Sequence, residues 1–130
     1  MRVQVFPIRD RLGFFSVVPY GSIDSDTSAD FSRQVDHLLV RSTKGIILDL
    51  QHVDYISSAG LGVLFSIKKS LKQHDGDLFF CNIKPQIRKL FEMVKALPDA
   101  TLFENAEDAD RYFYRIMNEE IEKRDGKKSL

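Results

Sequence analysis

The sequence has a single cysteine, Cys81, among its 130 residues. One cysteine excludes an internal disulfide and a metal cluster built on several thiolates. Cys81 ends an apolar run at residues 78–81, and a free cysteine in such a run is typically buried. We therefore expect Cys81 to be a buried, unreactive core residue.

The sequence also lacks a charge surplus and a long apolar stretch. Nineteen Lys and Arg residues balance nineteen Asp and Glu residues, whereas binding to a nucleic-acid backbone needs an excess of basic side chains. No segment approaches the roughly 18 apolar residues that a membrane-spanning helix needs, and the first residues lack the apolar stretch of a signal peptide. These absences predict a soluble, cytoplasmic protein that neither binds nucleic acid nor inserts into a membrane.

Motifs of nucleotide binding and ester hydrolysis are absent as well. Gly60 and Gly62 lack the third glycine of a dinucleotide-binding loop, and no Gly-x-x-x-x-Gly-Lys phosphate loop occurs. Ser58 is outside a Gly-x-Ser-x-Gly nucleophile elbow, and no histidine lies near it in the sequence to act as its base. The sequence therefore predicts a binding protein, not an enzyme, and no cofactor.

No metal site is predicted. The histidines lack the four-residue spacing that places two ligands on one helix face; they are His37, His52 and His74. Four aspartates could be imagined around a magnesium ion, but their positions near element ends are equally expected from capping and turn formation. These four are Asp24, Asp26, Asp49 and Asp54.

The length and the 43% hydrophobic content suit one domain with its own core. Segments rich in β-branched and aromatic residues alternate with segments of helical periodicity. Strands are expected at residues 3–8, 14–18, 45–50, 78–81 and 102–103. Helices are expected to begin near residues 27–28, at 57–58, at 85 and near 106. This alternation implies an α/β fold with a mixed, mostly parallel sheet of about four to five strands and about four helices.

Several element ends are predicted as well. The first helix is expected to end near residues 42–45, with Gly45 just past it, and the second near Asp75-Gly76. The last helix should continue past Ile121. We expect a domain at residues 1–118, followed at 119–130 by an extended helix end and a charged tail. The ten phenylalanines are expected in the core.

Residues 53–64 carry the clearest functional signal. They form a strand extension that leads through Ser57 and Ser58 directly into a helix, and either serine can cap that helix. Gly60 and Gly62 are poor helix formers, so two of them in one first turn suggest a need for small size. The free amides and the dipole of a helix start also favour a phosphoryl group on a serine there.

This stretch resembles the signature of STAS domains, the family of anti-sigma factor antagonists. Three further pieces follow in family order: residues 20–29, the strand at 45–50, and residues 83–93. The resemblance spans about residues 3–118 and implies the anti-sigma factor antagonist-like STAS fold.

The resemblance implies a phosphorylation switch at Ser58. In the family a partner kinase, which is also the anti-sigma factor, phosphorylates the matching serine, and a PP2C-type phosphatase reverses the reaction. The unphosphorylated form binds the partner and frees the sigma factor. The partner-binding residues so implied are Asp24, Ser57, Ser58, Ala59, Gly60, Leu61 and Gly62.

Some positions depart from the family pattern. Ser57 stands where several members have Asp, so a kinase could choose Ser57 in place of Ser58. Ala59 stands where some members have a second serine or a threonine. Asp24 can be a family-type partner-binding carboxylate, or a helix cap or loop carboxylate. A different function is also open, because STAS domains serve as regulatory subunits of membrane lipid or anion transporters.

Overall fold

The computed structural model describes residues 1–94 and 101–103 of the chain. Within them the order of elements is β1 (Arg2–Pro7), β2 (Phe14–Tyr20), α1 (Ser28–Asp36), β3 (Gly45–Asp49), α2 (Ser58–Lys72), β4 (Asp77–Cys81), α3 (Pro85–Val94) and β5 (Thr101–Phe103). The predicted strands and the first three predicted helices are therefore present. The predicted fourth helix and the charged tail lie outside the described residues.

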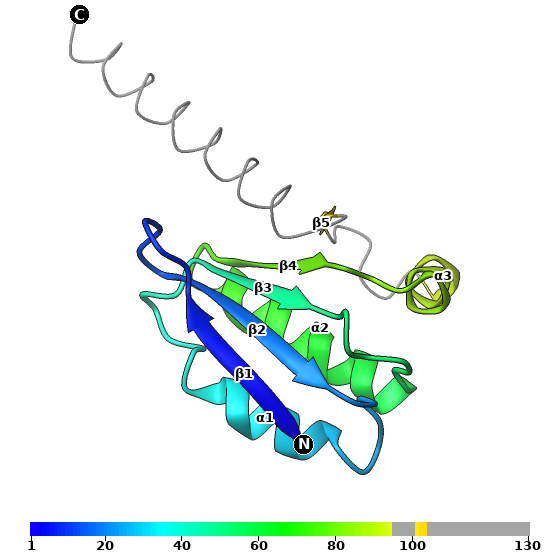
Figure 1. Ribbon diagram of the computed structural model, residues 1–130. Coiled ribbons are helices and arrows are strands. Elements are labelled where there is room, and N and C mark those ends of the chain that lie inside the picture. The colour runs from blue at the N-terminus through cyan, green and yellow to red at the C-terminus, as the bar shows by residue number, and fades with distance from the viewer. Residues whose placement is uncertain (95–100, 104–130) are drawn as a thin grey trace, which may run out of the picture.

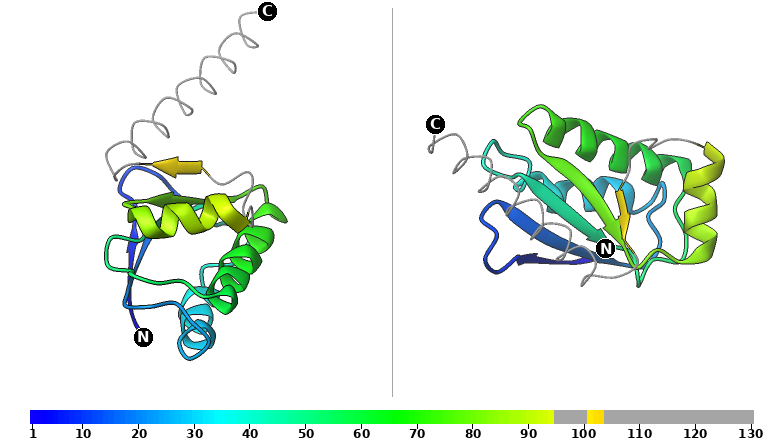
Figure 2. Two further views of the ribbon diagram at one scale, coloured as in Figure 1. Left: turned by 90° about the vertical axis from the view of Figure 1, so that its right-hand side faces the viewer. Right: turned by 90° about the horizontal axis from the view of Figure 1, so that it is seen from above.

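The strands form one mixed sheet in the order β1-β2-β3-β4-β5. Strand β1 is antiparallel to β2, whereas the other neighbours are parallel. Helices α1 and α2 lie side by side on one face of this sheet, and α3 lies beyond the carboxyl ends of β3 and β4 (Figures 1 and 2). The expected α/β fold with a mostly parallel sheet is confirmed.

The main core lies between the sheet and the two helices on its face. It contains Leu48 of β3 and Phe80 of β4, together with Phe31 of α1 and Leu64 of α2, each at most 1% exposed. A smaller cluster on the other face contains Ile47, Phe79 and Cys81. Both faces of β3 are therefore covered, which explains its continuous apolar run. Cys81 is buried, as expected.

The end of the first helix differs from the prediction. Helix α1 ends at Asp36, and hydrogen-bonded turns follow as far as Thr43. Gly45 is no helix cap but the first residue of β3, paired with Phe14 and Asp77. A β-carbon at residue 45 would come within 2.5 Å of the Phe14 ring. Gly45 thus allows this ring to lie against β3.

Two phenylalanines also depart from the expectation of core packing. Phe6 is 49% exposed on edge strand β1, and Phe65 is 52% exposed on α2. Phe65 directly follows the buried Leu64, and successive residues of an α-helix lie about 100° apart around its axis. Phe65 therefore falls beside the buried face of α2, not within it.

Candidate functional site

The loops that precede α1 and α2 are joined by a short parallel bridge between Ile23 and Ile56. The Ile23 amide donates a hydrogen bond to the Tyr55 carbonyl at 3.0 Å, and the Ser57 amide donates one to the Ile23 carbonyl at 2.9 Å. Asp24 directly follows this bridge on one strand, and Ser58 follows it on the other. The bridge therefore brings together the two segments that carry the predicted site residues.

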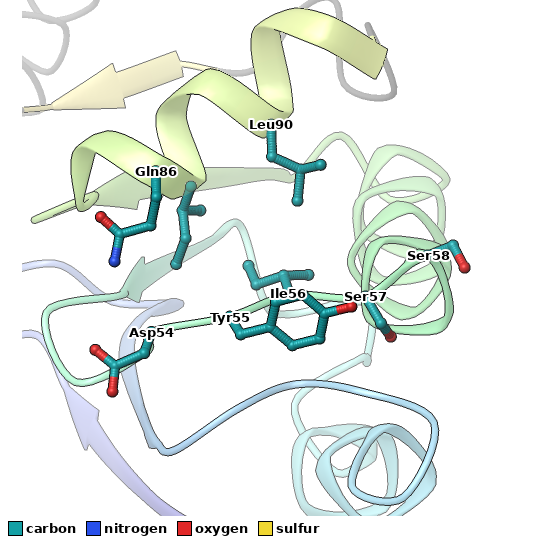
Figure 3. Close-up of a pocket in the computed structure, with 8 residues that line it drawn as sticks. Asp54, Tyr55, Ile56, Ser57, Ser58, Gln86 and Leu90 are labelled. Carbon is teal, nitrogen blue, oxygen red and sulfur yellow. The ribbon is translucent and has the colours of Figure 1, made fainter.

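The two serines at the start of α2 have different surroundings. Ser57 is the N-cap residue, and its hydroxyl accepts a hydrogen bond from the Gly60 amide at 3.2 Å. Its side chain is half-buried. Ser58 is the first residue of the helix and is exposed, and its hydroxyl points away from α3 (Figure 3). Ser57 is thus the predicted helix cap, and Ser58 presents the accessible hydroxyl.

The two glycines of the first turns also differ. A β-carbon at residue 60 would lie 2.3 Å from the Ile23 carbonyl oxygen and 2.9 Å from the Ile56 side chain, whereas one at residue 62 would meet nothing within 4 Å. Small size is therefore required at Gly60 by the fold itself. Gly62 is exposed, and its lack of a side chain leaves the helix surface open.

The outer side of α2 is uncharged for two turns after Ser58. Ser58, Gly62 and Phe65 are spaced by four and three residues, so they lie on the same side of the helix. Ala59 is exposed next to them, whereas Leu61 is 8% exposed and packs in the core. The first turn of α2 has no acidic residue, so the positive end of the helix dipole is not compensated there.

Asp24 caps the turn that leads into α1. Its Oδ1 atom accepts hydrogen bonds from the amides of Asp26 and Thr27 at 2.9 and 3.1 Å and from the Thr27 hydroxyl at 3.3 Å. Thr27 is the N-cap residue of α1, but its hydroxyl caps no helix amide and instead accepts a hydrogen bond from the Asp24 amide at 3.0 Å. Asp24 is therefore a carboxylate of the loop before α1 that bonds amides preceding the helix, and the residue is half-buried.

A pocket of about 270 Å³ lies between the 54–57 segment, the start of α2 and α3. Leu90 and Gln86 reach into it from α3, Asp54 lies at one end, and the serines lie at the other (Figure 3). Tyr55 is 57% exposed beside it. Tyr55, Gln86 and Leu90 were not among the site residues predicted from the sequence. Of these three residues, only Tyr55 carried a sequence signal, because it is an aromatic residue directly before the predicted start of a helix.

Three of the four aspartates considered for a magnesium site, Asp24, Asp49 and Asp54, take part in other interactions. Asp49 is 8% exposed and accepts hydrogen bonds from Gln51 and from the Asn82 side chain. Asp54 forms an ion pair with Lys84. Within residues 1–94 and 101–103, no three His, Cys, Asp or Glu side chains are grouped to hold a metal ion. Over the same residues, no helix is long and apolar enough to cross a membrane.

The STAS domain family matches residues 6–109 of the chain, which is more than half of its length. The chain therefore belongs to the STAS domain family. The matched range contains β2, the bridge between Ile23 and Ile56, and the whole of α2.

Three curated relatives are bacterial proteins named as established or candidate anti-sigma factor antagonists. BtrV of Bordetella bronchiseptica, named as a candidate anti-sigma factor antagonist, is 42% identical over 65 residues, which are 50% of this chain and 53% of BtrV. The anti-sigma F factor antagonist of Paenibacillus polymyxa is 27% identical over 68% of this chain and 77% of its own. The anti-sigma-B factor antagonist of Staphylococcus aureus is 29% identical over 62% and 74%. The match thus spans about half of BtrV.

Solved structures confirm the fold. The anti-sigma factor antagonist SpoIIAA in its unphosphorylated form has a TM-score of 0.68 at 15% identity, over 88% of this chain and 98% of its own. The murine anion transporter Slc26a9 has a TM-score of 0.66 at 20% identity, over 80% of this chain and 18% of its own. At these identities the likeness shows the fold alone.

Proposed function

We propose that this protein is an anti-sigma factor antagonist that binds an anti-sigma factor and is switched off by phosphorylation of Ser58. The curated relatives of this functional type support the general role. The observation that carries the residue assignment is the exposed Ser58 hydroxyl at the first position of α2, beside a Ser57 hydroxyl already used as the cap. A kinase can reach Ser58 without breaking that cap, and we place Ser57 second.

The start of α2 suits a switch that leaves the fold intact. The first amides of a helix lack intrahelical partners, and the helix dipole is positive there, so a phosphoryl group on Ser58 is tolerated by its own helix. The same group adds about −1.5 to −2 charges to the surface at pH 7. This surface contains Ala59, Gly62 and Phe65, which carry no charge. A partner surface complementary to these residues would then lose its fit.

The residues of the proposed interface divide into two groups. Ser58, Ala59 and Gly62 are exposed and contact the partner directly, with Asp24 at the edge of the same surface. Ser57, Gly60 and Leu61 shape the helix start: Ser57 caps it, Gly60 allows the close approach of Ile23, and Leu61 anchors the turn in the core. All seven residues therefore contribute to binding. The first group contacts the partner, and the second group shapes the helix start that presents it.

The proposed partners follow from the switch. The anti-sigma factor acts as the serine kinase for Ser58, and a PP2C-type phosphatase removes the phosphoryl group. Both reactions would occur in the cytoplasm, where anti-sigma factors and sigma factors meet. Neither step requires a catalytic group or cofactor from this chain, which acts as a binding protein.

A role as a regulatory subunit of a membrane transporter is the second candidate. The structural likeness to Slc26a9 shows that such transporters contain a domain of the same fold. That likeness does not favour the transporter role over the antagonist role, whereas two curated relatives are named as antagonists of anti-sigma factors. The accessible Ser58 also fits a phosphorylation switch, so the antagonist role is the one we propose.

Binding to purified anti-sigma factor kinases of the source organism tests this function. We expect the wild-type protein and Ser58→Ala to bind one of them, and Ser58→Asp to bind at least about tenfold more weakly. Ser57→Asp is unsuitable as a control because it changes the cap, so Ser42→Asp, at an exposed serine in the loop before β3 and away from the start of α2, serves instead. Mass spectrometry after incubation with ATP should place one phosphoryl group on Ser58. Equal binding by Ser58→Ala and Ser58→Asp would refute the switch.

A further inference from the structure

The pocket between the 54–57 segment and α3 opens next to the candidate phosphorylation site, since Ser57 and Ser58 line one end of it (Figure 3). We propose that this pocket receives a single apolar side chain of the partner protein that binds unphosphorylated Ser58. This inference rests on the proposed function and identifies a second contact of the same interface. The partner would bind along the α2 start and insert one anchoring residue between α2 and α3.

The pocket is large enough for one side chain and lies just below the usual size range of ligand sites. Its volume is about 270 Å³, whereas sites for small molecules and cofactors typically occupy about 300–1,000 Å³. Its inner wall is apolar: Ile56 and Ile87 are each 2% exposed, and Leu90 is half-buried above them. Protein interfaces commonly concentrate affinity in one apolar or aromatic residue that fills such a pocket.

The charges around the pocket argue against a phosphate-bearing ligand. Among the lining residues that the structure describes, Asp54 alone is charged. Lys84 lies nearby, but its ammonium group is paired with the Asp54 carboxylate. The free amides of the α2 start can accept a phosphate, but no cationic side chain among the described lining residues balances the further phosphates of a nucleotide beside Asp54. An apolar side chain needs no charged partner, because it can pack against Ile56, Ile87 and Leu90.

The position of the pocket relates it to the proposed switch. Tyr55 stands beside the opening and is 57% exposed, and three residues later Ser58 begins the uncharged outer side of α2. A partner residue in the pocket therefore lies within the same contact area as a phosphoryl group on Ser58. The partner residue in the pocket and the phosphorylation of Ser58 would therefore affect the same surface of the partner.

A titration with indole, the ring system of a tryptophan side chain, tests the pocket without any partner protein. The full-length, isotope-labelled chain is observed by NMR. We expect saturable shifts of the Tyr55, Ile56, Ile87 and Leu90 amide signals, and no such shifts with GTP. No saturable shift at these amides with indole would overturn the proposal, and shifts with GTP in place of indole would assign the pocket to a nucleotide.

Two tryptophan substitutions on α3 form a matched pair, one that blocks the pocket and one that serves as the control. Gln86→Trp adds an indole at the pocket, whereas Lys89→Trp adds the same ring on the same helix at an exposed position outside it. We expect Gln86→Trp to abolish the indole shifts and to weaken binding to the anti-sigma factor kinase at least about tenfold. Lys89→Trp should show the indole shifts and bind the kinase like the wild type.

The outcomes separate the pocket from the switch. If Ser58→Asp weakens binding but Gln86→Trp does not, the pocket inference fails and the switch stands. If neither Ser58 variant changes binding, the proposed function fails, while the indole titration still decides whether the pocket accepts an apolar side chain.

Discussion

The backbone carbonyl oxygen of Ile23 lies so close to Gly60 that a β-carbon at residue 60 would be 2.3 Å from it. The same oxygen accepts the hydrogen bond of the Ser57 amide. One carbonyl group therefore fixes both the cap and the first turn of α2 relative to the loop before α1. Ser58 lies between these two contacts, so its exposed hydroxyl is held by a rigid support.

The two glycines of α2 form a matched pair for testing this support. Gly60→Ala should lower the free energy of unfolding by about 1–3 kcal/mol, because the new methyl group cannot fit without moving backbone. Gly62→Ala should raise it by up to about 1 kcal/mol, because Ala is the better helix former and the site is open. Urea denaturation of both variants measures this difference. Equal effects of the two substitutions would contradict the close approach of Ile23.

Alanine substitutions at Ser57 and Ser58 should differ in their effect on the free energy of unfolding. Ser57→Ala removes the side-chain acceptor of the Gly60 amide and should cost about 0.5–2 kcal/mol. Ser58→Ala removes an exposed hydroxyl and should change the free energy of unfolding by no more than about 0.5 kcal/mol. Thermal or urea denaturation checks both. A Ser58→Ala variant as unstable as Ser57→Ala would show that Ser58 contributes to the cap.

Local patterns predicted the elements but not their long-range constraints. Helical spacing grouped the apolar residues Leu61, Leu64, Phe65, Ile67 and Leu71 on α2, and all but Phe65 are buried. The two serines were correctly predicted to start the helix. The same spacing could not place Phe65, because one step around the helix separates the edge of the core from the solvent. Which groups pack against each side of α2 depends on residues distant in the sequence, which no local pattern contains.

The roles of the glycines show the same limit. Both Gly60 and Gly45 are required by groups distant in the sequence, the Ile23 carbonyl and the Phe14 ring. From the sequence alone, Gly60 and Gly62 were equivalent, and Gly45 was equally suited to end a helix. The pocket beside Ser58 was also beyond prediction, because α3 forms one of its walls only after the parallel strands have placed it there.

Asp77 ties the last turns of α2 to the start of β4 and should make stability depend on acid pH. Burial raises the pKa of its carboxyl group, but hydrogen bonds from Lys68 and Lys72 and from the Leu78 amide outweigh that effect, so the pKa lies below its ordinary value. Such a carboxylate stabilises the fold above its unfolded pKa of about 3.9, and the stabilisation is lost as the pH falls through the lower folded-state value.

Asp77→Asn should therefore lower the free energy of unfolding at pH 7 and make less difference as the pH falls below about 4. Urea denaturation at a series of pH values gives the difference between the variant and the wild type. Asp75→Asn is the control: Asp75 is exposed with a φ of 63°, which Asn tolerates. A difference between Asp77→Asn and the wild type that persists unchanged at low pH would contradict the ion pairs.

Asp24 offers a way to separate a structural role from a binding role in one residue. Its Oδ1 atom caps the turn before α1, and an asparagine side chain has an oxygen that can accept the same hydrogen bonds. Asp24→Asn should therefore keep the free energy of unfolding within about 0.5 kcal/mol of the wild type, whereas Asp24→Ala should lower it by about 1 kcal/mol. Any effect of Asp24→Asn on binding must then come from the lost charge.

We expect Asp24→Asn to weaken binding to the anti-sigma factor kinase at least about threefold, because a carboxylate at the edge of an interface contributes through charge complementarity. Titration calorimetry at two salt concentrations measures this, and the loss should shrink at the higher one because screening weakens the wild-type contact. Asp26→Asn, an exposed neighbour in the same turn, should bind like the wild type. If Asp24→Asn also binds like the wild type, the carboxylate serves the fold as a cap, and the partner contact must be sought at Ser58, Ala59 and Gly62.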